Sequence, residues 1–308
     1  MKINIQELQQ LQALPLELKV LKTKQRIREW VNYYGKNSVY ISFSGGKDST
    51  VLLDIVREEF PEIEAVFVDT GLEYPEIRKF VKTFKNVVTI VPKLHFKEVV
   101  EKYGYPVVSK ETSLKLHELR QTKSEYLKTK YIDGLRRDGT PTRYKLAKKW
   151  IYLLNSPFKV SHKCCDVMKK NPIKLYEKNG KVPFIGMLAS ESKMRQQLYL
   201  KEGCNSFNTK RPTSNPLGFW TEQDILEYIL INDLKIASVY GEIIRDEAGK
   251  LKTTGESRTG CMFCMFGLHL EKGENRFQRM KRTHPKIYDY CINELKIGEV
   301  LDYIGVKY

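Results

Sequence analysis

Short apolar runs alternate with amphipathic segments along most of this chain. Four runs rich in Val, Ile and Phe predict strands, at residues 38–43, 64–68, 87–91 and 182–187. Apolar residues at helical spacing predict helices that begin after Gly46 and at residues 75–84, 96–103 and 221–232. Because strands that alternate with helices pair in parallel, the pattern predicts an α/β domain built on a parallel sheet.

Helices are also predicted at both ends of the chain. Residues 4–35 carry leucines at helical spacing and are interrupted by Pro15, which predicts one or two helices. Two short helices are predicted at residues 285–294 and 297–304. We therefore expect an N-terminal helical segment (1–35), an α/β domain (36–235) with a basic, largely helical insertion at about 109–160, and a C-terminal region (236–308).

Composition narrows the setting of the protein. The 308 residues are 41% apolar, enough for a real core, and no apolar run is long enough to span a bilayer. The first residues lack the apolar core of a signal peptide, so we expect a cytoplasmic protein with no membrane partner. In a reducing compartment, six cysteines are better explained as metal ligands or redox groups than as disulfides.

Positive charge is concentrated in one segment. The net charge is +16, and residues 109–181 hold 19 basic against 7 acidic residues. Such a concentration indicates a partner rich in phosphate, most simply a nucleic acid. Four aromatic residues of the segment could stack on its bases, namely Tyr126, Tyr131, Tyr144 and Trp150. A solvated helical face and ordinary core packing explain the same charges and rings equally well.

A glycine-containing loop separates the first predicted strand from the helix that follows it. The loop consists of Ser44, Gly45, Gly46, Lys47, Asp48 and Ser49. Two glycines let backbone N–H groups approach an anion at the positive end of a helix, Lys47 adds a charge, and Asp48 can hold a metal ion or a water. The P-loop of common NTPases needs a further glycine at the position of Ile41, so this is a different phosphate loop; the alternative is a plain βα turn.

Three more motifs follow the loop in order. Asp69 lies in Val-Asp-Thr-Gly (68–71), at the ligand side of an open sheet, although an Asx-turn explains it equally well. Gly-Met-Leu-Ala-Ser-Glu-Ser-Lys-Met-Arg occupies 186–195, and Pro-Leu…Trp-Thr-x-x-Asp-Ile-x-x-Tyr-Ile occupies 216–229. Together the four motifs resemble the PP-loop ATP pyrophosphatases (adenine nucleotide α-hydrolase-like), and within them the phosphoadenosine phosphosulfate (PAPS) reductase family. Met187 and Leu188 depart from the arginines usual in the third motif.

The resemblance implies a Rossmann-like (HUP-type) open parallel sheet with helices on both faces and an adenine nucleotide across the strand ends. The nucleotide phosphates would lie on the loop residues 44–49, and Arg195 would be a further phosphate ligand or, alternatively, a solvated charge. With an intact loop, this family cleaves ATP between the α- and β-phosphates with the help of Mg²⁺. Lys47, Asp48 and Asp69 would then be the catalytic residues.

Four cysteines form two pairs, Cys164–Cys165 and Cys261–Cys264. Two such pairs can complete four ligands, so the spacing leaves zinc and an iron–sulfur cluster open, and the apolar neighbours of the second pair favour a cluster. The adenylyl-sulfate reductase branch of the family binds a [4Fe–4S] cluster through a Cys-Cys pair and a later C-x-x-C. The resemblance therefore implies these four cysteines as cluster ligands, with Cys204 as a substitute for one of the first pair and Cys291 as a buried apolar residue.

Two differences point away from sulfonucleotide reduction. The reductases attack sulfur with a cysteine in a C-terminal Glu-Cys-Gly-Leu-His motif, whereas Phe266 precedes Gly267 here. They usually have a degenerate phosphate loop, whereas this loop is intact.

The chain is more similar to the iron–sulfur proteins of DNA phosphorothioation and tRNA thiolation. That similarity implies an ATP-dependent enzyme that activates a nucleic acid, DNA or tRNA, for sulfur transfer from a donor protein such as a cysteine desulfurase. The alternatives are a PAPS or adenylyl-sulfate reductase that uses thioredoxin, an ATP sulfurylase, and a non-catalytic nucleotide- and DNA-binding regulator.

Overall fold

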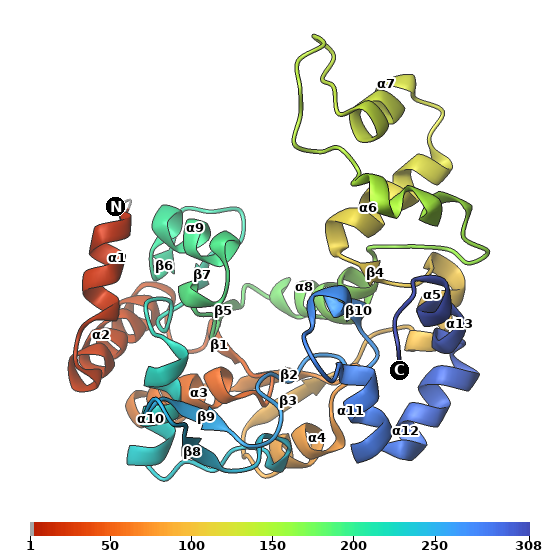
Figure 1. Cartoon of the computed structure of the whole chain (residues 1–308). Helices are drawn as coiled ribbons and strands as arrows, with labels where there is room; N and C mark the ends of the chain where they lie inside the picture. The colour runs from red at the N-terminus through yellow and green to blue at the C-terminus, as the bar shows by residue number, and fades with distance from the viewer. Residues whose placement is uncertain (1–2) are drawn as a thin grey trace. The chain divides into compact units, whose positions relative to one another are not determined.

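The four predicted strands and two short strands that were not predicted, β6 and β7, form one six-stranded sheet in the order β3-β2-β1-β5-β7-β6 (Figure 1). The structure is a computed structural model that describes residues 3–308. Five strands run parallel, and β6 pairs antiparallel with β7 at one edge, so the expected α/β class is confirmed. The strands are β1 (Val39–Ser42), β2 (Ala65–Val68), β3 (Val87–Ile90), β5 (Val182–Phe184), β6 (Asn205–Ser206) and β7 (Thr213–Ser214).

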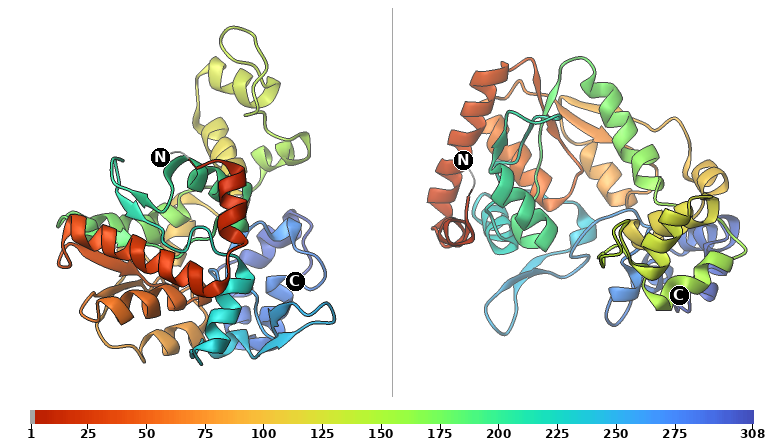
Figure 2. Two further views of the ribbon diagram at one scale, coloured as in Figure 1. Left: turned by 90° about the vertical axis from the view of Figure 1, so that its left-hand side faces the viewer. Right: turned by 90° about the horizontal axis from the view of Figure 1, so that it is seen from above.

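The predicted helices form close to the expected positions. Pro15 separates α1 (Ile5–Gln12) from α2 (Leu16–Tyr34), because proline has no N–H to continue the first helix. Both α2 and α10 pack against α3 (Figure 2). The other predicted helices are α3 (Lys47–Glu59), α4 (Pro75–Val81), α5 (Phe96–Tyr103), α10 (Glu222–Ile231), α12 (Pro285–Asp289), which continues as a π-helical turn at Tyr290–Glu294, and α13 (Ile297–Tyr303).

Both faces of the sheet are covered. Val39, Tyr40 and Ile41 of β1 are all buried, although successive side chains of a strand point to opposite faces. The Tyr40 hydroxyl donates to Glu177 of α8 (Asn171–Glu177) at 2.7 Å, which satisfies the polar end of this buried ring. Burial of each large apolar side chain stabilises the fold by about 1.5–3 kcal/mol.

Contacts divide the chain into two compact units, which are described separately. Unit 1 comprises the chain up to Asp69 together with residues 73–91 and 173–259, and it contains the six-stranded sheet. Unit 2 comprises residues 70–72, 92–172 and 260–308. This division differs from the three consecutive parts expected from the sequence, because the N-terminal helices share a unit with the sheet and the basic insertion shares a unit with the C-terminal region.

Unit 2 is largely helical. Its basic insertion follows β4 (Val107–Val108), which pairs in parallel with β10 (Met265–Phe266). Further elements of the unit are α6 (Lys110–Gln121), α7 (Glu125–Lys128), π-helical turns at Thr129–Asp133 and Asp166–Lys170, a 3₁₀ helix at Lys148–Asn155, and α11 (Arg276–Thr283). Over residues 3–308, no helix is both long and apolar enough to cross a membrane.

Two of the unpredicted elements of unit 1 lie near the phosphate loop. The first is α9 (Lys193–Glu202), which follows Ser192, a side-chain cap that accepts from the Arg195 N–H. The second is the antiparallel hairpin of β8 (Ile243–Arg245) and β9 (Leu251–Thr253). Both elements matter because residues from their neighbourhood reach the phosphate loop.

Candidate functional site

The phosphate loop connects β1 to α3 in unit 1. Gly46 has extended backbone angles and caps the helix, which begins at Lys47. Gly45 has a φ of +72°, and a Cβ there would approach Val81 and Ile77 of α4 to 2.8 and 2.9 Å. Gly45 is therefore required both by its backbone conformation and by the packing of α4 over the loop.

Hydroxyl groups hold the loop closed on itself. Ser49 Oγ donates to the Gly46 carbonyl at 2.9 Å and accepts from the Ser44 N–H at 3.2 Å. The Ser44 and Ser49 hydroxyls are 3.0 Å apart, and Thr50 Oγ1 also donates to the Gly46 carbonyl, at 3.0 Å. These contacts preorganise the loop before any anion binds.

Lys47 is buried and has two partners that were not predicted, Glu222 and Tyr240. Its Nζ lies 3.1 Å from Glu222 Oε1 and 5.3 Å from the centre of the Tyr240 ring. Its backbone N–H donates to the Tyr240 hydroxyl at 3.3 Å, and that hydroxyl lies 2.6 Å from Thr259 Oγ1. Glu222 belongs to the fourth motif, whereas nothing in the sequence pattern marked Tyr240 or Thr259.

Two arginines lie beside Asp48. Burial raises the pKa of its carboxyl, and the charges of Lys47, Arg258 and Arg195 counteract that rise. Arg195 forms an ion pair with Glu191, and Arg258 Nη1 lies 3.1 Å from the other oxygen of the same carboxylate. Burial also lowers the pKa of Arg195, and the nearby charge of Arg258 lowers it further.

The third motif contacts the loop through its first glycine. A Cβ at Gly186 would lie 3.1 Å from the Asp48 carbonyl oxygen, so the backbone of this motif packs directly on the phosphate loop. The charges of Arg195 and Arg258 both act on Asp48, and Arg258 comes from a segment that the sequence pattern did not mark. A phosphate-binding role for Arg195 stays a prediction.

Asp69 lies at the end of β2 and is held by α4. Its Oδ2 accepts from Arg78 Nε at 3.0 Å and from Nη2 at 2.8 Å, and its backbone N–H donates to the Ile90 carbonyl at 2.9 Å. The carboxylate is therefore fixed in place. A nucleotide role for Asp69 stays a prediction.

The four predicted cysteines come together in unit 2. Cys164, Cys165, Cys261 and Cys264 line one pocket, together with the apolar side chains of Leu72, Phe96, Pro106, Met168 and Phe266 and the stem of Lys169. The lining residues include no carboxylate and no imidazole. Four thiols in an apolar pocket fit an iron–sulfur cluster, because thiolates and a dry shell suit such groups.

The thiols affect one another. Burial raises the pKa of the Cys164 thiol, and the nearby Cys165, Cys261 and Cys264 raise it further, since each added thiolate would repel the others. Burial likewise raises the pKa of Cys264. Among residues 3–308, no group of three or more His, Cys, Asp or Glu side chains is arranged to hold a single metal ion.

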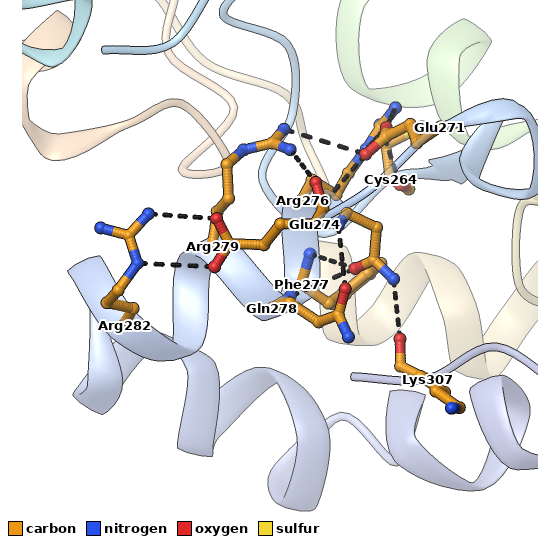
Figure 3. A network of polar contacts seen from close by, with 10 residues as sticks. Cys264, Glu271, Glu274, Arg276, Phe277, Gln278, Arg279, Arg282 and Lys307 are labelled. Carbon is orange, nitrogen blue, oxygen red and sulfur yellow. Dashed lines mark hydrogen bonds and ion pairs between the residues drawn. The ribbon is translucent and has the colours of Figure 1, made fainter. Parts of the chain in front are cut away.

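An arginine secures the turn that carries the second cysteine pair (Figure 3). Arg276 Nη1 donates to the Cys264 carbonyl at 3.0 Å, and its Nε donates to Glu271 Oε1 at 2.6 Å. The other Glu271 oxygen accepts from the Arg276 backbone N–H at 2.8 Å. The Cys264 N–H closes the turn on the Cys261 carbonyl at 3.1 Å. Arg276 therefore positions the turn, although the sequence did not mark it.

The remaining cysteines lie elsewhere. Cys204 is buried in unit 1, where its Sγ is 3.4 Å from the Tyr199 hydroxyl. It was considered as a substitute ligand, and that role stays a prediction. Cys291 is fully buried in the π-helical turn before α13, as expected for an apolar residue.

Comparison with known proteins identifies the family. The phosphoadenosine phosphosulfate reductase domain matches residues 38–161 and 150–265, which together make up more than half of the chain. An uncharacterised protein of Methanocaldococcus jannaschii is 24% identical over 266 residues, 84% of this chain and 48% of that protein. Adenosine 5'-phosphosulfate reductase 2 of Bacillus subtilis is 32% identical over 138 residues, 41% of this chain and 55% of that protein.

Among solved structures, one match is the phosphoadenylyl-sulfate (PAPS) reductase of Candida auris, in complex with phosphate. It is 14% identical, with a TM-score of 0.42, and the match covers 81% of this chain and 98% of that one. The chain spans about half the length of the curated relatives it matches. Because the reductase domain matches from the first sheet strand to the second cysteine pair, the chain belongs to the phosphoadenosine phosphosulfate reductase family.

Proposed function

We propose that this protein is an ATP-dependent enzyme that activates a nucleic acid for sulfur transfer, with a [4Fe–4S] cluster held by Cys164, Cys165, Cys261 and Cys264. The observation that carries the proposal is the intact phosphate loop, in which Lys47 and Asp48 open a helix beside two further arginines. A loop that only bridged a strand and a helix would have no need of three cations whose charges act on its carboxylate.

The proposed reaction begins at the loop. An oxygen of the acceptor attacks the α-phosphorus of ATP, the bond to the α–β bridging oxygen breaks, and pyrophosphate leaves with that oxygen. Lys47, Arg195 and Arg258 would stabilise the charge that develops on the pyrophosphate. Asp48 would hold Mg²⁺, which neutralises phosphate charge when bound. The hydroxyls of Ser44 and Ser49 would keep the loop amides in position.

The cysteine pocket supplies the second half of the proposal. The support is the convergence of four thiols on a pocket with apolar walls. When bound there, a cluster would supply a place to hold sulfur before transfer. A thiol reductant would release hydrosulfide from the persulfide of a donor protein such as a cysteine desulfurase. In the adenylated acceptor, the bond to this sulfur would form as the bond to the oxygen of AMP breaks, and AMP would leave. Arg276 would keep the Cys261–Cys264 turn in its liganding geometry.

AMP formation tests the proposal. Anaerobically purified protein is incubated with ATP, Mg²⁺, a sulfide source and either tRNA or DNA, and AMP and pyrophosphate are measured. We expect AMP to form only with the acceptor present, to be lost in Lys47→Ala, and to persist in Lys82→Ala, an exposed lysine of the same charge in unit 1. No AMP with any nucleic acid would overturn the proposal and favour the non-catalytic regulator.

A reductase is the second candidate, because the B. subtilis relative is named an adenosine 5'-phosphosulfate reductase. The same preparation is therefore also given adenylyl sulfate or PAPS with reduced thioredoxin, and sulfite is measured. Phe266 stands where the reductases place their nucleophilic cysteine, so we expect no sulfite. Sulfite release without AMP formation from ATP would establish the reductase instead.

A further inference from the structure

Residues 122–149, which follow α6 and include α7, form a strongly basic segment of unit 2 that we call the arm (Figure 1). The arm holds nine basic residues and three acidic ones. Two of its carboxylates are engaged locally, since Glu125 pairs with Lys128 at 2.7 Å and Asp138 accepts from the Thr140 N–H at 3.0 Å. Most of the positive charge of the arm is therefore not neutralised by its own acids.

The arm is anchored by hydrogen bonds. Arg120, just before it, donates to the carbonyls of Leu154, Ser156 and Phe158 at 2.6–2.9 Å. Within the arm, the Leu146 N–H donates to the Tyr131 carbonyl at 2.6 Å. The Tyr131 hydroxyl donates to Glu118 of α6, and the Tyr131 ring is buried. Tyr131 is therefore a structural anchor and is not available to stack on a base.

Other aromatic rings of the arm stand next to cations. Lys130 Nζ and the Arg143 guanidinium lie 4.9 and 5.3 Å from the centre of the Tyr144 ring, and that residue is 39% exposed. The Arg137 guanidinium lies 4.8 Å from the centre of the Tyr126 ring. No ion pair is found for Arg137 or Arg143 in the part of the chain that the structure describes, and both side chains belong to exposed residues.

We propose that the arm binds single-stranded nucleic acid, with Arg137 and Arg143 on the phosphates and an unpaired base stacked on Tyr144. This inference rests on the acceptor class of the proposed function and assigns it to named side chains. Cations with no ion pair among residues 3–308, beside one exposed ring, match a single strand, because its backbone needs positive charge and its bases have free faces. A duplex hides those faces, so Tyr144 would gain nothing from it.

Salt dependence of binding tests the phosphate contacts. Binding of a short labelled oligonucleotide to the full chain is measured without ATP, from about 50 to 200 mM salt. For Arg137→Gln with Arg143→Gln, the slope of log affinity against log salt should become less steep by about 1.4, since each lost single-strand contact removes about 0.7. Lys82→Gln with Lys85→Gln, an equal charge loss at exposed sites in unit 1, should leave the slope unchanged.

Stacking is tested separately. Tyr144→Leu should weaken binding about tenfold, the change expected for one stacked base, and should leave the salt slope unchanged. Tyr33→Leu, at an exposed ring in unit 1, is the matched control. Retained ATP affinity in all variants shows that they are folded. The affinities for single-stranded DNA and single-stranded RNA are compared, to establish which of the two nucleic acids the arm binds.

Each result decides the inference. Wild-type slope and affinity in the arm variants, or equal binding of a duplex and its single strands, would overturn it. Binding of an acidic protein to the arm, together with no binding of single strands, would also overturn it. Because binding is measured without turnover, single-strand binding without AMP formation would defeat only the proposed function, and AMP formation that depends on a nucleic acid, together with wild-type binding by the arm variants, would defeat only the arm.

Discussion

Replacing Glu222 by Gln tests how the phosphate loop is held before ATP arrives. In the structure, Lys47 Nζ lies 3.1 Å from Glu222 Oε1, so the ammonium that should meet a phosphate already has a carboxylate partner. A phosphate must replace that carboxylate. Under the proposed function, the variant should therefore bind ATP more tightly than the wild type, although it lacks a side chain that contacts the loop.

The exposure of the Lys47 and Glu222 side chains determines how large the change in ATP affinity should be. The Lys47 side chain is 6% exposed and that of Glu222 is 50% exposed, so the carboxylate keeps much of its hydration. The pair then belongs with partly exposed ion pairs, which stabilise a protein by about 0.2–1 kcal/mol. Removing it should tighten the Kd for ATP by about 1.4- to 5-fold. Lys47→Met should act oppositely and weaken binding by about 10- to 150-fold, because a hydrogen bond to a charged group contributes about 1.5–3 kcal/mol.

Isothermal titration calorimetry with ATP at fixed Mg²⁺ and salt measures both effects. Glu227→Gln is the matched control, because Glu227 is an exposed residue of the same helix and its loss changes the net charge equally. The control should leave the Kd within error of the wild type. Weaker ATP binding in Glu222→Gln would refute the reasoning, since it would make Glu222 a ligand of the nucleotide or its Mg²⁺ and not a competitor for Lys47.

Three further predictions concern stability, pH and the cysteine turn. Lys19→Met breaks a buried ion pair in which Lys19 Nζ lies 2.7 Å from Asp224 Oδ2; the Lys19 side chain is 2% exposed and that of Asp224 is 11% exposed. The free energy of unfolding, measured with urea, should therefore fall by about 3–5 kcal/mol. Asp48→Asn should abolish AMP formation yet raise the melting temperature at neutral pH, because burial raises the pKa of Asp48 and the ionised carboxylate destabilises the fold. The gain in melting temperature should shrink as the pH falls below that raised pKa, since the wild-type carboxyl is then neutral as well. A gain that stays the same at acid pH would contradict burial of the charge as its cause. Arg276→Gln should speed the loss of iron from the reconstituted protein to a chelator by about tenfold, because Arg276 holds the Cys264 carbonyl. Arg282→Gln, on the same helix, should leave the rate of iron loss unchanged. Equal rates of iron loss in the two variants would show that Arg276 does not position the turn.

Much of the fold could be predicted because the pattern of apolar residues along the chain indicates which side chains are buried. Val39 to Ile41 form a continuous apolar run, and the structure buries all three in a parallel strand that is covered on both faces. The division into two units could not be predicted in the same way. Val107 and Val108 pair with Met265 and Phe266, and no local pattern records a partner so distant in the chain.

The candidate site was predictable to the extent that its chemistry is local. Residues 44–49 are contiguous, and a glycine turn between a strand and a helix is visible in sequence. Tyr240 and Thr259 reach the loop, and Arg258 reaches Glu191, through tertiary packing, and a lone Tyr, Thr or Arg carries no signal of its own. The same limit applies to Arg276, whose role depends on one backbone carbonyl of the cysteine turn.

The ion pairs around the loop indicate which ligands it favours. Lys47 is paired with Glu222, and both Arg195 and Arg258 are paired with Glu191, so the cations already have carboxylate partners. An incoming anion therefore exchanges one partner for another, and each exchange returns little free energy when one member of the pair is partly exposed. A triphosphate can replace both carboxylates at once, whereas AMP carries a single phosphate and can replace only one. On this reasoning the loop should hold ATP more tightly than AMP, and Glu222→Gln, which removes the first exchange for both nucleotides, should leave the ratio of the two Kd values largely unchanged.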